Sequence, residues 1–429
     1  MKLKPSVSKL KSYLWESKTP LVMALFSVIT LSVSFFSNSV IAKELGATAY
    51  GQYNFITGLI MLLGMSASFG LDTLSFSLFN QKNNTFSSRQ FFNFSLSFTF
   101  ITGALLTFAA LTALKFIFPH ELFTNQVFVW LAFGIFMQGF MTIGIAWLRT
   151  FDQVLISHAL TNTLRVCVQG AFILFIIEFT NLYDFEWALF SYSISYFIAL
   201  VPLAFIVIKI YPFKHPNTKT KPMDWLKKSS YIFIYEITHN FYQHIDIFIL
   251  ELLNKGSEMG VYLMARKLSL FASLFTTLMG ANNQGIMSKL HFEDKITALQ
   301  SHINRQCRIS LISTCIIALL IFILSGYFVQ WLGKDFSAAT EPLIILLLGE
   351  ILISSFGNLS LFFPVSGIEK KGKLSVWIAT GIQVCLAPIV WPFWGPNGFA
   401  LVVVLANLVK CLIQNYIVKK NRAVSFGVF

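Results

Sequence analysis

Long apolar segments alternate with short polar connections along the whole chain. Each apolar segment is long enough for a helix rising about 1.5 Å per residue to cross a hydrocarbon core about 30 Å thick. The pattern therefore predicts twelve membrane-spanning helices in two sets of six. The first set is residues 20–41, 52–79, 92–118, 127–147, 156–179 and 185–210. The second set is residues 231–252, 259–287, 309–331, 343–365, 374–394 and 399–417.

The composition agrees with a chain that has lipid as its main solvent. Of its 429 residues, 55% are hydrophobic, only 12% are charged and 46 are phenylalanine. A soluble enzyme or a disordered chain needs a larger share of charged and polar residues, so the composition excludes both. We expect an all-α integral membrane protein.

A formal net charge of +13 is high enough to suggest nucleic-acid binding. The positions of the basic residues along the chain give a different explanation of the charge. If the N-terminus is cytoplasmic, 24 of the 32 Lys and Arg residues fall on the cytoplasmic side of the predicted spans. This asymmetry follows the positive-inside rule. We therefore expect both termini in the cytoplasm and no nucleic-acid partner.

A short motif recurs at an offset of 209 residues. Gly51-Gln52-Tyr53 follows the first predicted span and Gly260-Val261-Tyr262 follows the seventh, and we interpret both as turns. The same offset places a polar stripe of the first span on a polar stripe of the seventh. The stripe of the first span consists of Ser27, Thr30, Ser34 and Ser37.

The repeat predicts two six-helix bundles related by a pseudo-two-fold axis along the membrane normal, with a central cavity. Because six is an even number, both bundles enter the membrane in the same direction. The predicted division is an N-terminal cytoplasmic tail (1–19), a first bundle (20–210), a basic cytoplasmic linker (211–230), a second bundle (231–418) and a cytoplasmic tail (419–429).

Several charged residues lie inside predicted spans, where insertion of a charge costs about 2.5 to 3.5 kcal/mol. The basic ones are Arg165, Arg266, Lys267 and Lys410. The seventh span carries the densest polar stripe, which covers about 160° of the helix surface. Its members are Glu236, His239, Asn240, Gln243, His244 and Asp246. Two interpretations stay open: the intramembrane polar residues line a water-filled cavity, or they pair with one another inside the protein.

No motif indicates catalysis, a resident metal or a cofactor. The five cysteines lie within predicted spans or beside their ends, without the spacing of metal ligands. The connections between spans are too short to hold a catalytic domain. We therefore expect a protein that is not an enzyme and that needs no cofactor.

Three stretches of the sequence carry a family resemblance. They are residues 45–53 (LGATAYGQY), residues 69–72 (FGLD), and Asp246 followed by Gly260-Val261-Tyr262 and residues 265–268 (ARKL). Together with the two sets of six spans, these stretches resemble the Wzx-type polysaccharide flippases of the MOP superfamily, which also contains the MATE drug transporters and the lipid II flippase. The resemblance implies translocation of an undecaprenyl-diphosphate-linked oligosaccharide, of O-antigen or capsule type, from the cytoplasmic to the periplasmic leaflet of a bacterial inner membrane by alternating access.

The resemblance also assigns roles to the intramembrane polar residues. The cations Arg165, Arg266, Lys267 and Lys410 are the candidates for binding the substrate diphosphate. The candidates for contacting the sugars are Asn162, Gln169, Asn240, Gln243, Asn358 and Asn407. Independently of the resemblance, the acidic and imidazole groups Glu236, His239, His244 and Asp246 are the candidates for ion coupling, with the proton as the favoured ion; consumption of the product in the periplasm is the other driving force that stays open. The implied partners are the lipid-linked oligosaccharide, membrane lipid, a polysaccharide polymerase and a chain-length regulator.

Two other functions stay open at this point. A MATE-like multidrug or cation antiporter would share the fold but would favour an acidic, aromatic cavity. A multispan polysaccharide polymerase would act on the same lipid-linked units but would need a large periplasmic loop with catalytic groups. The intramembrane cations favour the flippase over the first, and the short connections favour it over the second.

Overall fold

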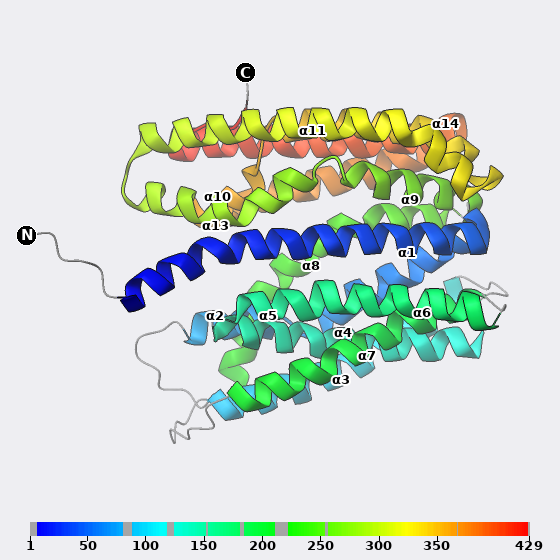
Figure 1. Cartoon of the computed structure of the whole chain (residues 1–429), viewed down its shortest axis with the longest axis horizontal. Helices are drawn as coiled ribbons and strands as arrows, with labels where there is room; N and C mark the ends of the chain where they lie inside the picture. Colours follow the sequence, from blue (N-terminus) through cyan, green and yellow to red (C-terminus); the bar gives the residue numbers. More distant parts are fainter. Residues whose placement is uncertain are drawn as a thin grey trace, which may run out of the picture. The chain divides into compact units, whose positions relative to one another are not determined.

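The computed structural model describes residues 7–79, 88–117, 124–151, 153–180, 184–210, 222–253, 256–366 and 368–427. Within these ranges the chain consists of helices joined by turns and short irregular segments, with no strand (Figure 1). The prediction of an all-α membrane protein is therefore confirmed.

The helices follow one another with few residues between them. The first part of the chain forms α1 (Val7–Ala67), α2 (Leu71–Phe79), α3 (Ser88–Ile117), α4 (Asn125–Thr150), α5 (Val154–His158), the π-helix η1 (Ala159–Leu164), α6 (Arg165–Thr180), α7 (Phe185–Ile210) and α8 (Pro222–Leu252). The second part forms α9 (Gly256–Leu270), α10 (Leu274–Phe292), α11 (Ile296–Leu332), the 3-10 helix η2 (Lys334–Ala339), α12 (Thr340–Ser354), α13 (Leu359–Ser366) and α14 (Glu369–Arg422).

Two of these helices are broken at a glycine. Gly46 interrupts α1 with φ 74° and ψ 171°, and Gly395 interrupts α14 with φ 51° and ψ −137°. Both values lie in a region that side chains with a Cβ disfavour, so glycine permits each break. Both breaks fall between predicted spans, the first between residues 41 and 52 and the second between residues 394 and 399.

Within the described residues, eight helices are long and apolar enough to cross a membrane, or nine if the pair α9 and α10, bent by 56°, forms one span. α1 and α14 each count once here although each contains a break, and α8 with its polar stripe is not among the eight. The count is consistent with the twelve predicted spans.

Three predicted spans contain breaks that hydropathy did not indicate. Residues 52–79 are interrupted at Phe69 and Gly70, which have φ of 51° and 71°. Residues 343–365 are interrupted at Gly357, with φ 55°. Residues 259–287 bend between α9 and α10. Hydropathy reports only whether a segment is apolar. These breaks lie inside apolar segments, so hydropathy does not detect them.

The chain divides into two compact units. The first unit is Met1–Ser37 with Ile56–Ile237, and the second is Asn38–Phe55 with Thr238–Phe429. Residues 38–55 of α1 therefore belong to the second unit, which the predicted division did not anticipate. Most of the predicted linker lies outside the described residues, and its last part, from Pro222, is helical and begins α8.

The repeated glycine-tyrosine motif forms a helix contact, which corrects the interpretation as turns. Gly51 and Gly260 both lie inside helices, α1 and α9. A Cβ added to Gly51 would lie 2.7 Å from the Gly256 carbonyl oxygen, and one added to Gly260 would collide with the Ala47 carbonyl. The motif thus lets two backbones approach closely, as small residues do between membrane helices.

The predicted C-terminal tail packs on the second unit. Val424 and Phe426 are each 1% exposed, and Phe426 packs in a core cluster that includes Cys307 and Phe362. Gln300 of α11 donates a hydrogen bond to the Ser425 carbonyl at 2.8 Å and accepts one from the Ser425 N–H at 2.8 Å. The residues after α14 are therefore part of the fold.

Candidate functional site

A polar pocket of about 210 Å³ lies inside the second unit. Its walls come from α8, α9, α12 and both limbs of α14, so residues distant in sequence meet there. Four charged side chains line it, and they are Asp246, Arg266, Glu350 and Lys410. Two acidic and two basic groups give the pocket a formal charge of zero.

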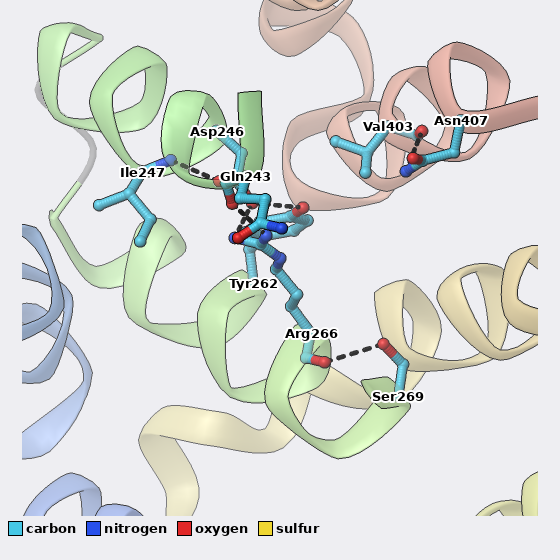
Figure 2. Close-up of polar contacts among 8 residues, drawn as sticks. All are labelled: Gln243, Asp246, Ile247, Tyr262, Arg266, Ser269, Val403 and Asn407. Carbon is cyan, nitrogen blue, oxygen red and sulfur yellow. Dashed lines mark hydrogen bonds and ion pairs between the residues drawn. The ribbon is translucent and has the colours of Figure 1, made fainter. Parts of the chain in front are cut away.

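Asp246 and Arg266 form an ion pair at this pocket (Figure 2). The Asp246 side chain is 4% exposed and the Arg266 side chain 24%. The Asp246 carboxylate also accepts hydrogen bonds from the Ile247 N–H at 2.9 Å and the Tyr262 hydroxyl at 3.2 Å. Arg266 donates from Nη2 to the Gln243 carbonyl oxygen at 2.7 Å. The buried carboxylate is therefore compensated by one cation and two further donors.

Lys410, on α14, lines the same pocket and contacts neutral groups. The Oδ1 atom of Asn407 accepts hydrogen bonds from Lys410 Nζ at 3.1 Å and from the Tyr242 hydroxyl at 2.7 Å. The same ammonium lies 4.5 Å from the centre of the Tyr242 ring. Asn407 is fixed by its own donation to the Val403 carbonyl at 3.1 Å (Figure 2). Lys410 is thus held in place while its charge is not cancelled by a direct ion pair among the described residues.

Lys267 follows Arg266 in the sequence but is not among the residues that line this pocket. Successive residues of a helix are separated by about 100° around its axis, so the two side chains leave α9 in different directions. Lys267 Nζ donates hydrogen bonds to the side-chain oxygens of Asn38 and Asn54, the second at 2.6 Å, and lies 5.2 Å from the Tyr50 ring centre. These contacts join α9 to the part of α1 that belongs to the second unit.

Arg165 belongs to the first unit and begins α6 directly after the π-helix η1. Its guanidinium carbon lies 4.7 Å from the Tyr196 ring centre and 5.7 Å from that of Tyr192. Its Nε donates to the Thr161 carbonyl within η1 at 3.2 Å. Short π-helical segments are frequent at functional sites, and here one sets the position of an intramembrane arginine.

The structure divides the polar stripe of α8 between the two units. Glu236 belongs to the first unit, where it accepts a hydrogen bond from the Thr73 hydroxyl at 2.5 Å. Thr73 adjoins Asp72, which accepts from Ser68 Oγ at 2.9 Å beside the backbone break. Asp246 belongs to the second unit, so the two carboxylates that the sequence grouped together have separate surroundings.

The remaining predicted residues have varied environments. Asn358 donates from Nδ2 to the Thr276 carbonyl at 3.2 Å, and Gln169 is buried in α6. Asn162 lies within η1, while Asn240 and His244 are half-buried on α8. The side chain of His239 lies outside those that the structure describes. Among the predicted sugar contacts, the polar pocket brings together only Gln243 and Asn407.

The polar stripe of the first span contacts the fifth span. Ser27 Oγ and His158 Nε2 are 3.3 Å apart, and the hydroxyl oxygens of Thr30 and Thr163 are 3.1 Å apart. In this part of the first unit the interpretation that intramembrane polar residues pair with one another therefore holds.

Sequence reasoning missed two pocket residues, Tyr242 and Gln383. Tyr242 lies four residues before Asp246 and hence on the same face of α8, but its aromatic ring placed it among the apolar residues. Gln383 is an amide within an otherwise apolar span, and this signal could have identified it. Among the described residues, no group of three or more His, Cys, Asp or Glu side chains could hold a metal ion.

Comparisons with known proteins agree with this architecture. A family profile described as "Polysaccharide biosynthesis protein" matches residues 18–282. A multidrug resistance MATE transporter of the MOP superfamily in an inward-facing conformation is 13% identical, with a TM-score of 0.75 over 94% of this chain and 99% of that chain. The lipid II flippase MurJ is 16% identical, with a TM-score of 0.71 over 93% and 87% of the two chains.

A MOP superfamily transporter from Pyrococcus furiosus is 14% identical, with a TM-score of 0.65 over 92% of this chain and 94% of that chain. No curated protein sequence matched. At these identities the solved structures establish the fold alone, whereas the profile covers more than half of the chain. The chain therefore belongs to the polysaccharide biosynthesis protein family, and it is a multi-pass membrane protein with the fold of MOP superfamily transporters.

Proposed function

We propose that this protein moves an undecaprenyl-diphosphate-linked oligosaccharide repeat unit, of O-antigen or capsule type, from the cytoplasmic to the periplasmic leaflet of a bacterial inner membrane by alternating access. The observation that carries the proposal is the match to the polysaccharide biosynthesis family on a chain with the fold of MOP transporters. One of the structural neighbours is named a lipid II flippase.

The contacts that each intramembrane cation makes indicate which of the four cations bind the diphosphate. Arg266 is balanced by Asp246. Lys267 does not line the pocket, and its two bonds to asparagine oxygens join α9 to α1. Arg165 and Lys410 rest on tyrosine rings and bond to neutral oxygens. Lys410 is oriented by neutral groups and makes no direct ion pair among the described residues, so it keeps its charge for an anionic ligand. We therefore assign a diphosphate contact to Lys410, keep Arg165 as the intramembrane cation of the first unit, and give Lys267 a packing role.

The contacts of the two carboxylates in the polar stripe of α8 assign proton coupling to Glu236 rather than to Asp246. Asp246 is already engaged with a cation, and exchange of a proton there would disrupt a buried ion pair. Glu236 is held by the Thr73 hydroxyl, which can serve as donor to a carboxylate and as acceptor from a carboxylic acid. This carboxyl group can therefore gain or lose a proton without losing its partner.

The cation assignment is tested in the native bacterium by surface polysaccharide. Arg165→Ala and Lys410→Ala should each abolish surface polysaccharide while the protein stays in the membrane at its normal level. The matched control is Lys295→Ala, which removes a lysine whose side chain is 61% exposed and paired with Glu293, and should change nothing. Normal polysaccharide in both cavity variants would contradict the assignment.

Similarity to a MATE transporter makes export of an organic cation the second candidate. The pocket is not the predominantly acidic site that an organic cation would favour, because Arg266 and Lys410 balance Asp246 and Glu350. Efflux of ethidium from cells that express the protein, abolished by Glu350→Gln, would favour this candidate over the flippase.

The proposal includes the orientation and the partners of the protein. Both termini would lie in the cytoplasm, so a reporter fused after Arg422 should behave as cytoplasmic. The translocated unit would next be used by a polysaccharide polymerase under a chain-length regulator. A periplasmic signal from the reporter would contradict the proposed topology.

A further inference from the structure

We propose that the pocket of the second unit binds one sugar ring, a neutral group rich in hydroxyls, through an unpaired carbonyl oxygen of Gln383 and the surrounding charged side chains. The inference rests on the proposed function, because the proposed cargo carries sugars. It adds a place for one of those sugars inside a single unit of the protein.

The first observation is a buried acceptor without a donor. Gln383 lies on the first limb of α14, is 3% exposed and lines the pocket. Its Oε1 atom is buried and accepts no hydrogen bond within the described part of the chain. A buried acceptor left unpaired is costly, so an O–H or N–H group of a ligand would gain by satisfying it.

The groups around Gln383 favour a ligand with hydroxyl groups beside it. Asp246 and Glu350 oppose Arg266 and Lys410, and all four side chains line the same space. A carboxylate or an ionised diphosphate diester has no O–H or N–H group, so such an anion, even when it contacts Lys410, would leave the Gln383 oxygen without a donor. A cation would meet Arg266 and Lys410. Hydroxyl groups both donate and accept, so a sugar can bond to the acids, the bases and the amide at once.

The size and the aliphatic part of the lining fit a single ring. The pocket volume of about 210 Å³ lies below the range of about 300 to 1,000 Å³ of sites that enclose drug-sized ligands. Aliphatic side chains also line the pocket, among them Leu346, Ile353 and Val403. Such side chains can cover the C–H face of a sugar ring. The pocket therefore suits one ring of the oligosaccharide rather than the whole unit.

The competing occupant is water, which would also satisfy Gln383. Purified full-length protein in detergent should distinguish the two through its melting temperature. We would titrate N-acetylglucosamine, glucose, galactose, mannose and rhamnose, with inorganic phosphate at matched ionic strength as the charged comparison. We expect at least one sugar to raise the melting temperature with saturation, whereas any effect of phosphate, which would act through Lys410, should be unchanged by Gln383→Leu. If no sugar raises the melting temperature, the inference is wrong.

Gln383→Leu separates binding from folding. Because Oε1 is unpaired in the free protein, the substitution should leave the melting temperature of the free protein unchanged or higher, while the sugar affinity falls about tenfold or more. The matched control is Gln306→Leu. Gln306 is a buried glutamine of α11, 3% exposed, whose amide atoms also have no hydrogen-bond partner within the described part of the chain. This control should leave sugar affinity unchanged. Equal affinity losses in both variants would contradict a contact at Gln383.

These experiments can refute the sugar pocket and the proposed transport function independently of each other. Transport of a lipid-linked saccharide by a protein that binds no free sugar would overturn this inference and leave the proposed function intact. Saturable sugar binding that Gln383→Leu weakens, in a protein that moves no lipid-linked saccharide, would support the pocket and overturn the proposed function.

Discussion

Replacing Arg266 with methionine should destabilise the protein strongly, because it leaves the carboxylate of Asp246 buried without its cation. The Asp246 side chain is only 4% exposed, so water cannot replace the lost charge, although the Ile247 N–H and Tyr262 hydroxyl remain as donors. Breaking a buried pair by removing one partner costs about 3 to 5 kcal/mol. We expect a loss in this range in the free energy of unfolding.

The reverse substitution, Asp246→Asn, should cost less. The Arg266 side chain is 24% exposed, so water can solvate the cation, and asparagine can still accept a hydrogen bond from Tyr262. We expect a loss of about 1 to 3 kcal/mol, the usual cost of a lost buried hydrogen-bond partner. In the double variant, Arg266→Met should cost much less than it does alone, because no buried charge is left.

The assay is equilibrium unfolding of purified protein in mixed micelles with a rising fraction of denaturing detergent, followed by helical circular dichroism and tryptophan fluorescence. The matched control is Lys295→Met, which removes the cation of the exposed Glu293 pair and should change stability by less than about 1 kcal/mol. Equal losses for the two single substitutions, or additive losses in the double variant, would refute the argument from burial.

Three further predictions concern other sites. Gly260→Ala should lower the yield of folded protein sharply, because the added Cβ meets the Ala47 carbonyl. The control Gly326→Ala, whose added Cβ has no atom within 4 Å, should not lower the yield, and equal yields for the two variants would refute the close contact. Lys267→Met should reduce stability by about 1 to 3 kcal/mol in the same unfolding assay, and should lower transport only in proportion to the folded protein. Glu236→Gln should fold normally but transport without responding to an imposed proton gradient, and an unchanged response in vesicles would exclude this residue from coupling.

The membrane architecture could be predicted because lipid imposes a simple requirement. A span needs a long apolar segment, and such segments end at the charged residues before Gly46 and at the Pro-Phe-Trp-Gly-Pro-Asn-Gly stretch around Gly395. The breaks at Phe69 and Gly70 were not predictable in this way, because they depend on local backbone angles inside an apolar segment. Gly260 was identified through its repeat, but its role was assigned to a turn, since glycine serves both turns and close helix packing.

The site was predictable only in part. Arg266 and Lys410 were identified because charges are rare in lipid, and the structure brings both to one pocket. Lys267, the next residue after Arg266, is also a cation inside a predicted span, so the sequence does not distinguish the two. Its side chain nevertheless leaves α9 in another direction and donates hydrogen bonds to residues of α1. The contacts of such a side chain depend on the rotation of its helix about the helix axis and on which helix faces it. The pattern of polar and apolar residues within one span shows neither.

The central claim is that this protein carries a lipid-linked saccharide from one leaflet to the other. The most direct test uses proteoliposomes that contain undecaprenyl-diphosphate-linked N-acetylglucosamine in both leaflets, probed from outside by a membrane-impermeant enzyme that modifies the sugar. We expect the protein to increase the modified fraction beyond the outer-leaflet share seen in protein-free liposomes, and Lys410→Ala to remove the increase. A modified fraction equal to that of protein-free liposomes, with folded protein present, would contradict it.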